Sequence, residues 1–392
     1  MMFTGSISFL PLLLCLQVAL TSSFEVPFPQ SSAEIRSSII GSDMPKPTTQ
    51  PNNNDNPPIT RQVRLGSGTT AEVITCIPPQ KSSSPLDNLL SPLLGNTNTN
   101  NNKKKPTLAF LHGSFHASWC WAEHYMPHFA SLGYPCVAFS LQGTGGTPTT
   151  EVNAKKVKIA SHVADLNAFL KGLSDQDEDT LGLGLGVDPN VVLIGHSFGG
   201  LTIMKYLEQT YATTDNNNNQ EVNLAGVGLM CSVPPSGNGA MTMRFIRRSL
   251  KDAWKITVGF VMKKAITDKT IARDLFFGGT EDENGISDED VERYQSYFER
   301  DTVATIDLGD LAKKLPSALV DEEGRAPFVE SLPPVFVIGA SEDFIVDREG
   351  VDETARYMGL EEALIVDSPH DVMLGRRWRN GADAILEFIG TL

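Results

Sequence analysis

The sequence predicts an α/β fold, a mostly parallel sheet with helices on both faces. Short apolar runs of strand length alternate with longer stretches of helical pattern along most of the chain. The runs 107–111 and 191–194 are almost entirely apolar, as expected of strands buried on both faces. Strand–helix–strand units join parallel neighbours through right-handed crossovers, which places helices on both sides of the sheet.

The first two strands are expected to form a hairpin, because Gly66-Ser67-Gly68 separates two β-rich runs, 61–65 and 71–77. Further strands are expected at 107–111, 134–139, 191–194, 224–231, 335–338 and 363–366, and helices at 119–132, 159–170 and 198–211. Residues 234–333 break the alternation with a long segment of helical character between two late strands. Such an insertion predicts a helical cap over one edge of the sheet.

Composition excludes some classes of protein. The 392 residues are 41% hydrophobic, enough for a large core, and carry a net charge of −15. A nucleic-acid-binding protein needs a dominant basic surface, so no nucleic-acid partner is expected. The five cysteines form no C-x-x-C pair and no Cys/His cluster, which favours free thiols over disulfides or a zinc site. No metal or organic cofactor is expected, and the oligomeric state is left open.

The N-terminus has the pattern of targeting segments. An apolar run at 9–20, followed by small residues, predicts a signal peptide over 1–23, with an uncleaved signal anchor as the alternative. Ser22-Ser23-Phe24 resembles the junction of bipartite plastid-targeting sequences, so residues 24–60 are expected to be a transit-like or disordered segment. Entry into the secretory pathway is therefore expected, ending in a plastid or in secretion or the endomembrane system.

Three more polar tracts, at 82–105, 174–190 and 213–220, lie between structured runs and are expected to be surface-loop insertions. The remaining segment, 61–392, is expected to be one domain that includes the cap at about 234–333.

The motif with the clearest chemistry is Gly195-His196-Ser197-Phe198-Gly199, which matches G-x-S-x-G. An apolar strand precedes it and a helix follows it. This context predicts a nucleophile elbow, in which Ser197 sits on a strained turn and the two glycines let strand and helix approach. The start of the helix behind Ser197 also favours developing negative charge.

Ser197 needs a base and an acid. His370 is the only one of seven histidines that follows Ser197, and it comes directly after the last expected strand. Asp343 follows the preceding strand and is expected to orient His370; Asp347 and Glu342 are the rivals.

An oxyanion hole needs two backbone N–H donors. The first is expected from Phe198, directly after the nucleophile, and the second from Ser114, in the His112-Gly113-Ser114-Phe115 turn after the strand 107–111. His112 is expected to be a structural hydrogen-bonding residue. Three neighbours, His116, His124 and His128, are also interpreted as structural, because no set of carboxylates is paired with them.

Taken together, these residues resemble the α/β-hydrolase superfamily, in its serine-nucleophile branch of esterases and lipases (AB hydrolase-1 type). The resemblance covers about residues 61–392 and rests on His112-Gly113, the motif 195–199, Asp343 and His370. The loop 143–147 is similar to the family's Gly-rich loop, which usually carries a His where Thr144 stands. The turn at 112–119 is similar to the same turn in plant-type esterases.

The resemblance implies a serine hydrolase that cleaves carboxylic esters, including lipid-like acyl esters, through a Ser–His–Asp triad and an acyl-enzyme. Alternatives stay open. A thioesterase or acyltransferase would use the same site, a hydroxynitrile-lyase-like enzyme would use the triad as a base, and a non-catalytic member of the fold would bind a small ligand.

The beginning of the cap, 241–264, alternates basic residues with bulky apolar ones inside an acidic protein. One interpretation is a lid that makes peripheral contact with a membrane and lines a pocket for an acyl chain. The other is an ordinary amphipathic cap helix with solvated Arg and Lys.

Overall fold

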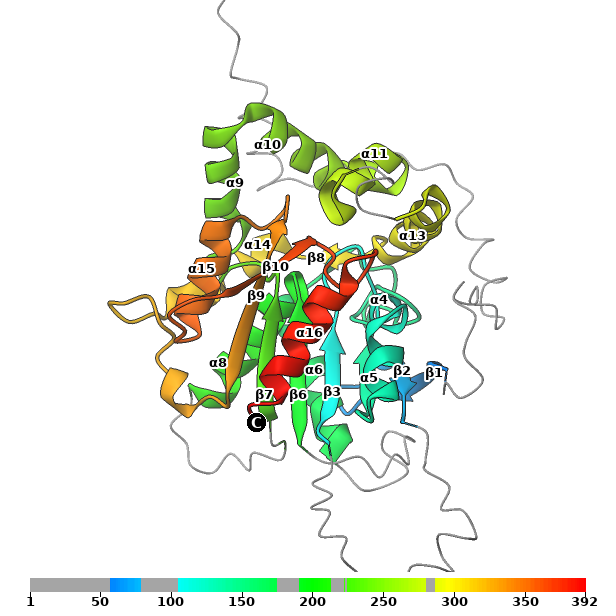
Figure 1. The fold of residues 1–392 in the computed structure, drawn as a ribbon, viewed down its shortest axis with the longest axis vertical. Helices are drawn as coiled ribbons and strands as arrows, with labels where there is room; N and C mark the ends of the chain where they lie inside the picture. Colours follow the sequence, from blue (N-terminus) through cyan, green and yellow to red (C-terminus); the bar gives the residue numbers. More distant parts are fainter. Residues whose placement is uncertain (1–56, 79–104, 175–189, 213–221, 223, 280–285) are drawn as a thin grey trace, which may run out of the picture.

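The computed structural model describes residues 57–78, 105–174, 190–212, 222, 224–279 and 286–392. Its centre is an eight-stranded sheet in the order β1-β2-β4-β3-β6-β7-β9-β10 (Figure 1). The strands are β1 (Ile59–Arg64), β2 (Thr70–Cys76), β3 (Thr107–Leu111), β4 (Cys136–Phe139), β6 (Val191–His196), β7 (Leu224–Met230), β9 (Val335–Glu342) and β10 (Leu364–Pro369). The pairs β1–β2 and β2–β4 are antiparallel, and every later pair in the sheet is parallel.

This architecture confirms the expected α/β-hydrolase fold with its mostly parallel sheet. The inner strands β3, β4 and β6 are buried along their whole length, which explains why their sequences are almost continuously apolar. Gly195 of β6 pairs with Leu111 of β3 on one side and Leu229 of β7 on the other, so the carboxyl ends of these strands meet at one edge.

Helices cover both faces of the sheet, as predicted. They are α4 (Trp119–Ala122), α5 (Tyr125–Ser131), α6 (Ile159–Ser174), α8 (Phe198–Tyr211), α15 (Arg348–Tyr357) and α16 (Trp378–Ile389). On one face α5 and α16 lie side by side, because Trp378 of α16 packs against His124, Tyr125 and His128 (Figure 1). On the other face α6 packs against α8.

The segment between β7 and β9 forms the expected cap, above the carboxyl ends of the strands (Figure 1). Its helices are α9 (Asn238–Arg248), α10 (Leu250–Ile256), α11 (Lys269–Ala272), α13 (Asp288–Asp301) and α14 (Leu308–Leu311), with π-helical turns at Thr257–Val261 and Arg273–Phe277 and 3-10 turns at Lys264–Ile266, Pro316–Ala318 and Val329–Ser331. Helix α13 begins at a favourable cap, since the Ser287 hydroxyl accepts the Asp290 amide and three acidic residues occupy the first turn.

Two details differ from the sequence prediction. The cap is not purely helical, because β8 (Thr305–Ile306) pairs with β5 (Lys156–Val157) in a separate two-stranded sheet. Two residues are too short a run to show the alternation that marks a strand. The single helix expected at 119–132 is two helices, because His124 has φ −135° and interrupts the helical backbone.

Some predictions concern residues outside the described part. The predicted signal peptide and nearly all of the 24–60 segment lie there, as do most of the three polar tracts. Within the described part, β1 begins at Ile59, the four cysteines are buried free thiols as expected, and no helix is long and apolar enough to cross a membrane.

Candidate active site

Ser197 occupies a strained turn between β6 and α8. Its backbone angles are φ 53° and ψ −119°, in a region that residues with a side chain rarely adopt. The Ser197 amide is anchored to the Met230 carbonyl at 3.0 Å. Gly199 has to be glycine, because a Cβ there would lie 2.5 Å from the carbonyl oxygen of Leu111. These features are those of the predicted nucleophile elbow.

The turn after β3 packs directly against this elbow. A Cβ on Gly113 would lie 2.7 Å from Cβ of Ser197, so only glycine lets the two loops approach. Within the described residues, the Ser114 amide donates to no backbone acceptor. Phe198 is the first residue of α8, and amides of a first helical turn have no partner within the helix. Phe198 is thus the direct neighbour of Ser197, and Ser114 is the direct neighbour of Gly113, which packs on Ser197. Both amides remain candidates for the oxyanion hole.

His370 and Asp343 are brought together at the carboxyl ends of β10 and β9. Nδ1 of His370 lies 2.9 and 2.8 Å from the two carboxylate oxygens of Asp343, and both side chains are buried. The amides of Ile345 and Val346 donate to Asp343 Oδ1, each at 2.8 Å. A carboxylate held in this way accepts the Nδ1–H and leaves Nε2 of His370 free to take a proton.

His370 is also close to the elbow. The Nε2–H of His196, the residue before Ser197, donates to the carbonyl of His370 at 3.0 Å, and the two imidazole rings are 4.7 Å apart. Burial, and then His370, lowers the pKa of His196 to about 3, so His196 is neutral. A neutral neighbour does not oppose a positive charge on His370.

The rival acids are engaged elsewhere. Asp347 caps the start of α15 through the Gly350 amide and forms a two-bond ion pair with Arg244 of the cap. Glu342 pairs with Arg377 at 2.6 Å. The structure thus places Asp343, and neither rival, on His370.

His112 fills the structural role expected of it. Its Nδ1–H donates to the Gly113 carbonyl at 2.8 Å, and its Nε2 accepts the Leu141 amide at 2.9 Å. Burial lowers the pKa of His112 to about 4, which keeps the ring neutral and able to accept. His112 therefore ties the oxyanion loop to the loop after β4.

Sequence reasoning missed the partner of His116. Its Nε2 lies 2.9 Å from Oδ2 of Asp371, the residue directly after His370, and both side chains are buried. The two positions are 255 residues apart in the chain. No local pattern links such positions, although an acid beside the only available base is a signal that could have been weighed.

Aromatic residues of the cap cover the site. Phe276 lies 6.4 Å from the ring of His370 and 5.6 Å from Phe115 of the oxyanion loop, ring centre to ring centre. Phe260 and Phe298 pack on Phe115 at 5.1 and 5.9 Å. With Ser197 only 8% exposed, the space above it is apolar and largely closed to water.

Buried polar contacts hold the cap over this site. Asp301, the last residue of α13, accepts the indole N–H of Trp119 at 2.9 Å and the amide of Gly145 at 2.7 Å. Arg293 of α13 forms a two-bond ion pair with Glu123 near the end of α4. The cap is thus joined to α4, which follows the oxyanion turn, and to the loop after β4.

Two groups of described side chains offer metal-ligand atoms close together: His196, His370 and Asp371, and Cys231, Asp343 and His370. Both include His370, whose Nδ1 is already bonded to Asp343. Burial, and then Asp343, raises the pKa of the Cys231 thiol well above its ordinary value, so the thiolate that binds metals is disfavoured. The residues fit proton transfer better than metal binding.

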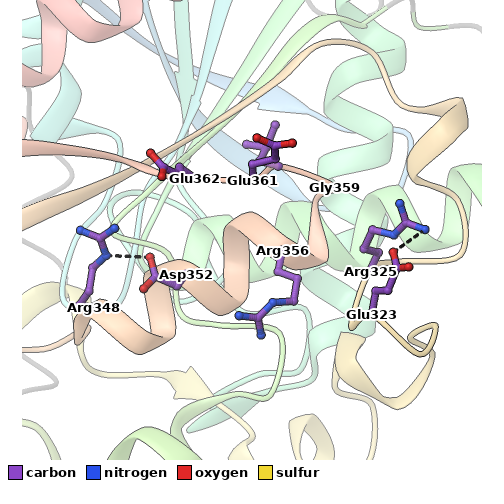
Figure 2. A pocket seen from close by; sticks show the side chains of 9 residues that line it. Glu323, Arg325, Arg348, Asp352, Arg356, Gly359, Glu361 and Glu362 are labelled. Carbon is purple, nitrogen blue, oxygen red and sulfur yellow. Dashed lines mark hydrogen bonds and ion pairs between the residues drawn. The ribbon is translucent and has the colours of Figure 1, made fainter.

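A separate hollow lies along α15 (Figure 2). Its lining combines acidic and basic side chains, with ion pairs of 2.7 Å between Arg348 and Asp352 and 2.9 Å between Arg325 and Glu323. Residues 359–362 of its lining precede β10, so the hollow reaches the amino end of that strand. Ser197 lies at the other end of the sheet, where the strands have their carboxyl ends. These two ion pairs are exposed to solvent, and we assign no site there.

Solved structures share this fold at low identity. An epoxide hydrolase from Vigna radiata, VrEH1, is 18% identical with a TM-score of 0.50, and covers 86% of this chain and 98% of that one. 2-Hydroxy-6-oxo-6-phenylhexa-2,4-dienoate hydrolase from Rhodococcus sp. strain RHA1 is 15% identical with a TM-score of 0.52, and covers 84% and 99%.

Curated relatives match a shorter stretch. Methylesterase 1 of Arabidopsis thaliana is 29% identical over 107 residues, which are 27% of this chain and 35% of that protein. Norfluorocurarine synthase 1 of Strychnos nux-vomica is 28% identical over 102 residues, 26% of this chain and 33% of that protein. The chain thus spans about a third of the length of these relatives. The model of the alpha/beta hydrolase family, in contrast, matches residues 108–381, more than half of the chain. The protein belongs to the alpha/beta hydrolase family.

Proposed function

We propose that the protein is a serine hydrolase that cleaves carboxylic esters. The observation that carries this proposal is the His370–Asp343 pair, buried at the carboxyl edge of the sheet where the strained Ser197 turn also lies. A serine hydroxyl is a weak nucleophile unless a base takes its proton, and a base of this kind needs a carboxylate on its other nitrogen. The methylesterase among the relatives supports the same class of reaction.

In the proposed reaction, Nε2 of His370 takes the Ser197 proton as the hydroxyl oxygen attacks the ester carbonyl. The amides of Phe198 and Ser114 stabilise the oxyanion, and the His370 imidazolium returns its proton to the leaving alcohol. Water then loses a proton to His370 and attacks the acyl-enzyme. His370 returns that proton to the Ser197 oxygen as its bond to the acyl group breaks, which releases the acid and restores Ser197. Asp343 stays ionised and stabilises the imidazolium in both halves.

The lining supports a preference for apolar acyl groups. Phe276 lies 6.4 Å from the ring of His370 and 5.6 Å from Phe115 of the oxyanion loop, so these two rings offer apolar faces and few polar groups beside the base. A medium or long acyl chain would bury its apolar surface there, at about 0.8 kcal/mol per methylene group.

The test is hydrolysis of p-nitrophenyl esters from acetate to decanoate, with an acyl thioester and an acceptor alcohol in parallel assays. Asp343→Asn should lower kcat by about four orders of magnitude, since His370 would then carry its proton on the wrong nitrogen. Glu342→Gln is the matched control and should keep kcat, because Glu342 pairs with Arg377 instead.

If the folded protein hydrolyses none of these esters, the proposal is contradicted and a ligand-binding member of the fold is favoured. Thioester cleavage or transfer to the alcohol in preference to ester hydrolysis would replace esterase by thioesterase or acyltransferase. A preference for acetate alone would overturn the proposed acyl pocket.

We also propose that the first cap helices contact an anionic membrane. Four large apolar side chains on or beside α9 and α10 are about half exposed: Met243, Leu250, Trp254 and Met262. Three exposed basic residues of the same segment, Arg247, Lys251 and Lys264, form no ion pair within the described residues, although the protein as a whole is acidic. Exposed apolar and cationic groups together are the pattern of helices that lie on anionic lipid surfaces.

Co-sedimentation with vesicles tests this contact. The protein should bind vesicles that contain phosphatidylserine more tightly than pure phosphatidylcholine, and Trp254→Ser should weaken binding. Leu364→Ser is the control, since Leu364 is 49% exposed but begins β10 at the opposite edge of the sheet. Equal binding by Trp254→Ser and wild type would contradict the proposal.

A further inference from the structure

The buried pair of His116 and Asp371 is not explained by the proposed chemistry. Both nitrogens of His116 face oxygen atoms: Nδ1 lies 2.8 Å from the Ser114 carbonyl, and Nε2 lies 2.9 Å from Asp371 Oδ2. The side chains of His116 and Asp371 are 1% and 0% exposed. Burial of two ionisable groups is costly unless they pair with each other, so the arrangement calls for a physical reason.

The acceptors decide the protonation of His116. A backbone carbonyl can only accept, so Nδ1 carries a proton toward Ser114. Nε2 faces a carboxylate, which accepts a second proton. His116 is thus an imidazolium paired with an ionised Asp371. Electrostatics agree, because the Asp371 carboxylate and these hydrogen bonds outweigh burial and raise the pKa of His116, while His116 lowers that of Asp371.

The pair joins the two loops that the reaction needs. On one side it holds the Ser114 carbonyl, which belongs to the oxyanion turn. On the other side Asp371 is the direct neighbour of His370, and its backbone amide donates to the Phe276 carbonyl of the cap at 3.0 Å. One ion pair therefore links the oxyanion turn, the loop of the base and the cap.

The oxyanion turn needs such support. Phe115 has φ 69°, a left-handed conformation that favours glycine and strains a residue with a large side chain. The Ser114 N–H lies in the Gly113–Ser114 peptide, and the Ser114 carbonyl lies in the next one, Ser114–Phe115. The hydrogen bond from His116 therefore fixes the backbone directly after the expected oxyanion donor, because it holds the Ser114–Phe115 peptide. Without the imidazolium donor, this peptide would be free to turn.

We propose that His116 and Asp371 are positioning residues. They form a second His–Asp pair that holds the oxyanion turn in place relative to His370. This inference rests on the proposed function for its effect on catalysis, but the protonation of His116 is a claim about the structure alone. It predicts that loss of the His116 donor lowers kcat more than it raises KM, because a misplaced oxyanion donor acts mainly on the transition state.

The kinetic test uses His116→Phe and the double variant His116→Phe/Asp371→Asn. The single variant leaves Asp371 as an unpaired buried charge, so both Tm and kcat should fall. The double variant removes that charge and should recover Tm, yet kcat should stay roughly tenfold to hundredfold below wild type with KM within about threefold. Glu208→Gln breaks an ion pair with Lys205 toward the C-terminal end of α8, outside the site, and should lower Tm with kcat retained.

A purely structural pair would give a different result, since kcat in the double variant would then recover together with Tm. That recovery would overturn the positioning role.

The second measurement is ¹⁵N NMR of histidine-labelled wild type at pH 7.5, with the His116 signals assigned from their absence in the double variant. Both ring nitrogens should be protonated. A neutral His116 would overturn the ion pair. A wild type without ester hydrolysis would refute the proposed function, while the NMR result would still decide the pair.

Discussion

Ser197 combines the side chain that we propose as the nucleophile with an unfavourable backbone conformation. A residue other than glycine in such a conformation costs about 1–3 kcal/mol, and the surrounding structure must hold it in place. Here the Met230 carbonyl, the close approach at Gly113 and the start of α8 do so. The strained turn places Ser197 at the carboxyl end of β6, the edge of the sheet where His370 also lies.

This strain has a measurable consequence. Ser197→Gly removes the hydroxyl and the strain together, whereas Ser197→Ala removes only the hydroxyl. In urea unfolding, the glycine variant should therefore be more stable than the alanine variant by about 1 kcal/mol, after the entropic cost of glycine is subtracted. An alanine variant as stable as the glycine variant would mean that the turn is unstrained.

The buried histidines predict how stability depends on pH. Burial lowers the pKa of His162 to about 3, so its ring stays neutral in the folded state. In the unfolded chain its pKa is about 6.5, so the unfolded state binds more protons and stability falls as the pH drops below that value. At pH 5 the penalty for His162 alone is about 2 kcal/mol.

His162→Phe should remove that part of the acid sensitivity, so that Tm falls less between pH 7 and pH 5 than it does in wild type. Differential scanning calorimetry at both pH values checks this. An unchanged difference between the two Tm values would show that His162 does not titrate as a buried neutral ring.

At the scale of elements, long helices and strands with a clear hydrophobic pattern could be predicted from the sequence, whereas very short ones could not. The strands β3 and β6 and the helix α8 appear where their sequence patterns indicate, because buried strands are continuously apolar and the elbow motif marks where the helix begins. β5 and β8 could not be predicted, because each has two residues and forms only by pairing with the other across the chain. The arrangement of the cap above the site likewise depends on tertiary contacts, which no local sequence pattern shows.

The cap is the element that should set acyl specificity. Phe260 is partly buried and packs edge-on against Phe115 at 5.1 Å. Phe260→Ala would open space beside the oxyanion turn, so kcat/KM for decanoate should rise several-fold relative to butyrate. Steady-state kinetics on the two esters measure this ratio. Phe328→Ala, a buried ring beside Tyr357 of α15, is the control that should leave the ratio unchanged. A fall in the ratio would mean that Phe260 contacts the acyl chain rather than limiting it.

At the scale of the whole molecule, the parallel sheet assembles the site. Ser114 follows β3, Ser197 follows β6, Asp343 follows β9 and His370 follows β10. The carboxyl ends of parallel strands lie at one edge, so residues far apart in sequence become neighbours. Each of these positions could be predicted from its place after a strand.

The contacts that stabilise the site could not be predicted in the same way. The pairing of His116 with Asp371 and that of Asp301 with Trp119 depend on how loops and cap fold over the sheet edge. No sequence periodicity determines such contacts. The motif thus predicts the reacting groups, whereas their support emerges only from the three-dimensional structure.

The central claim is that Ser197 is an activated nucleophile, and labelling with a fluorophosphonate probe tests it most directly. The purified wild type should be labelled at Ser197, and labelling should disappear in Ser197→Ala while the unfolding transition is retained. Wild-type protein that is folded but unlabelled, or a Ser197→Ala variant that still labels, would contradict the claim.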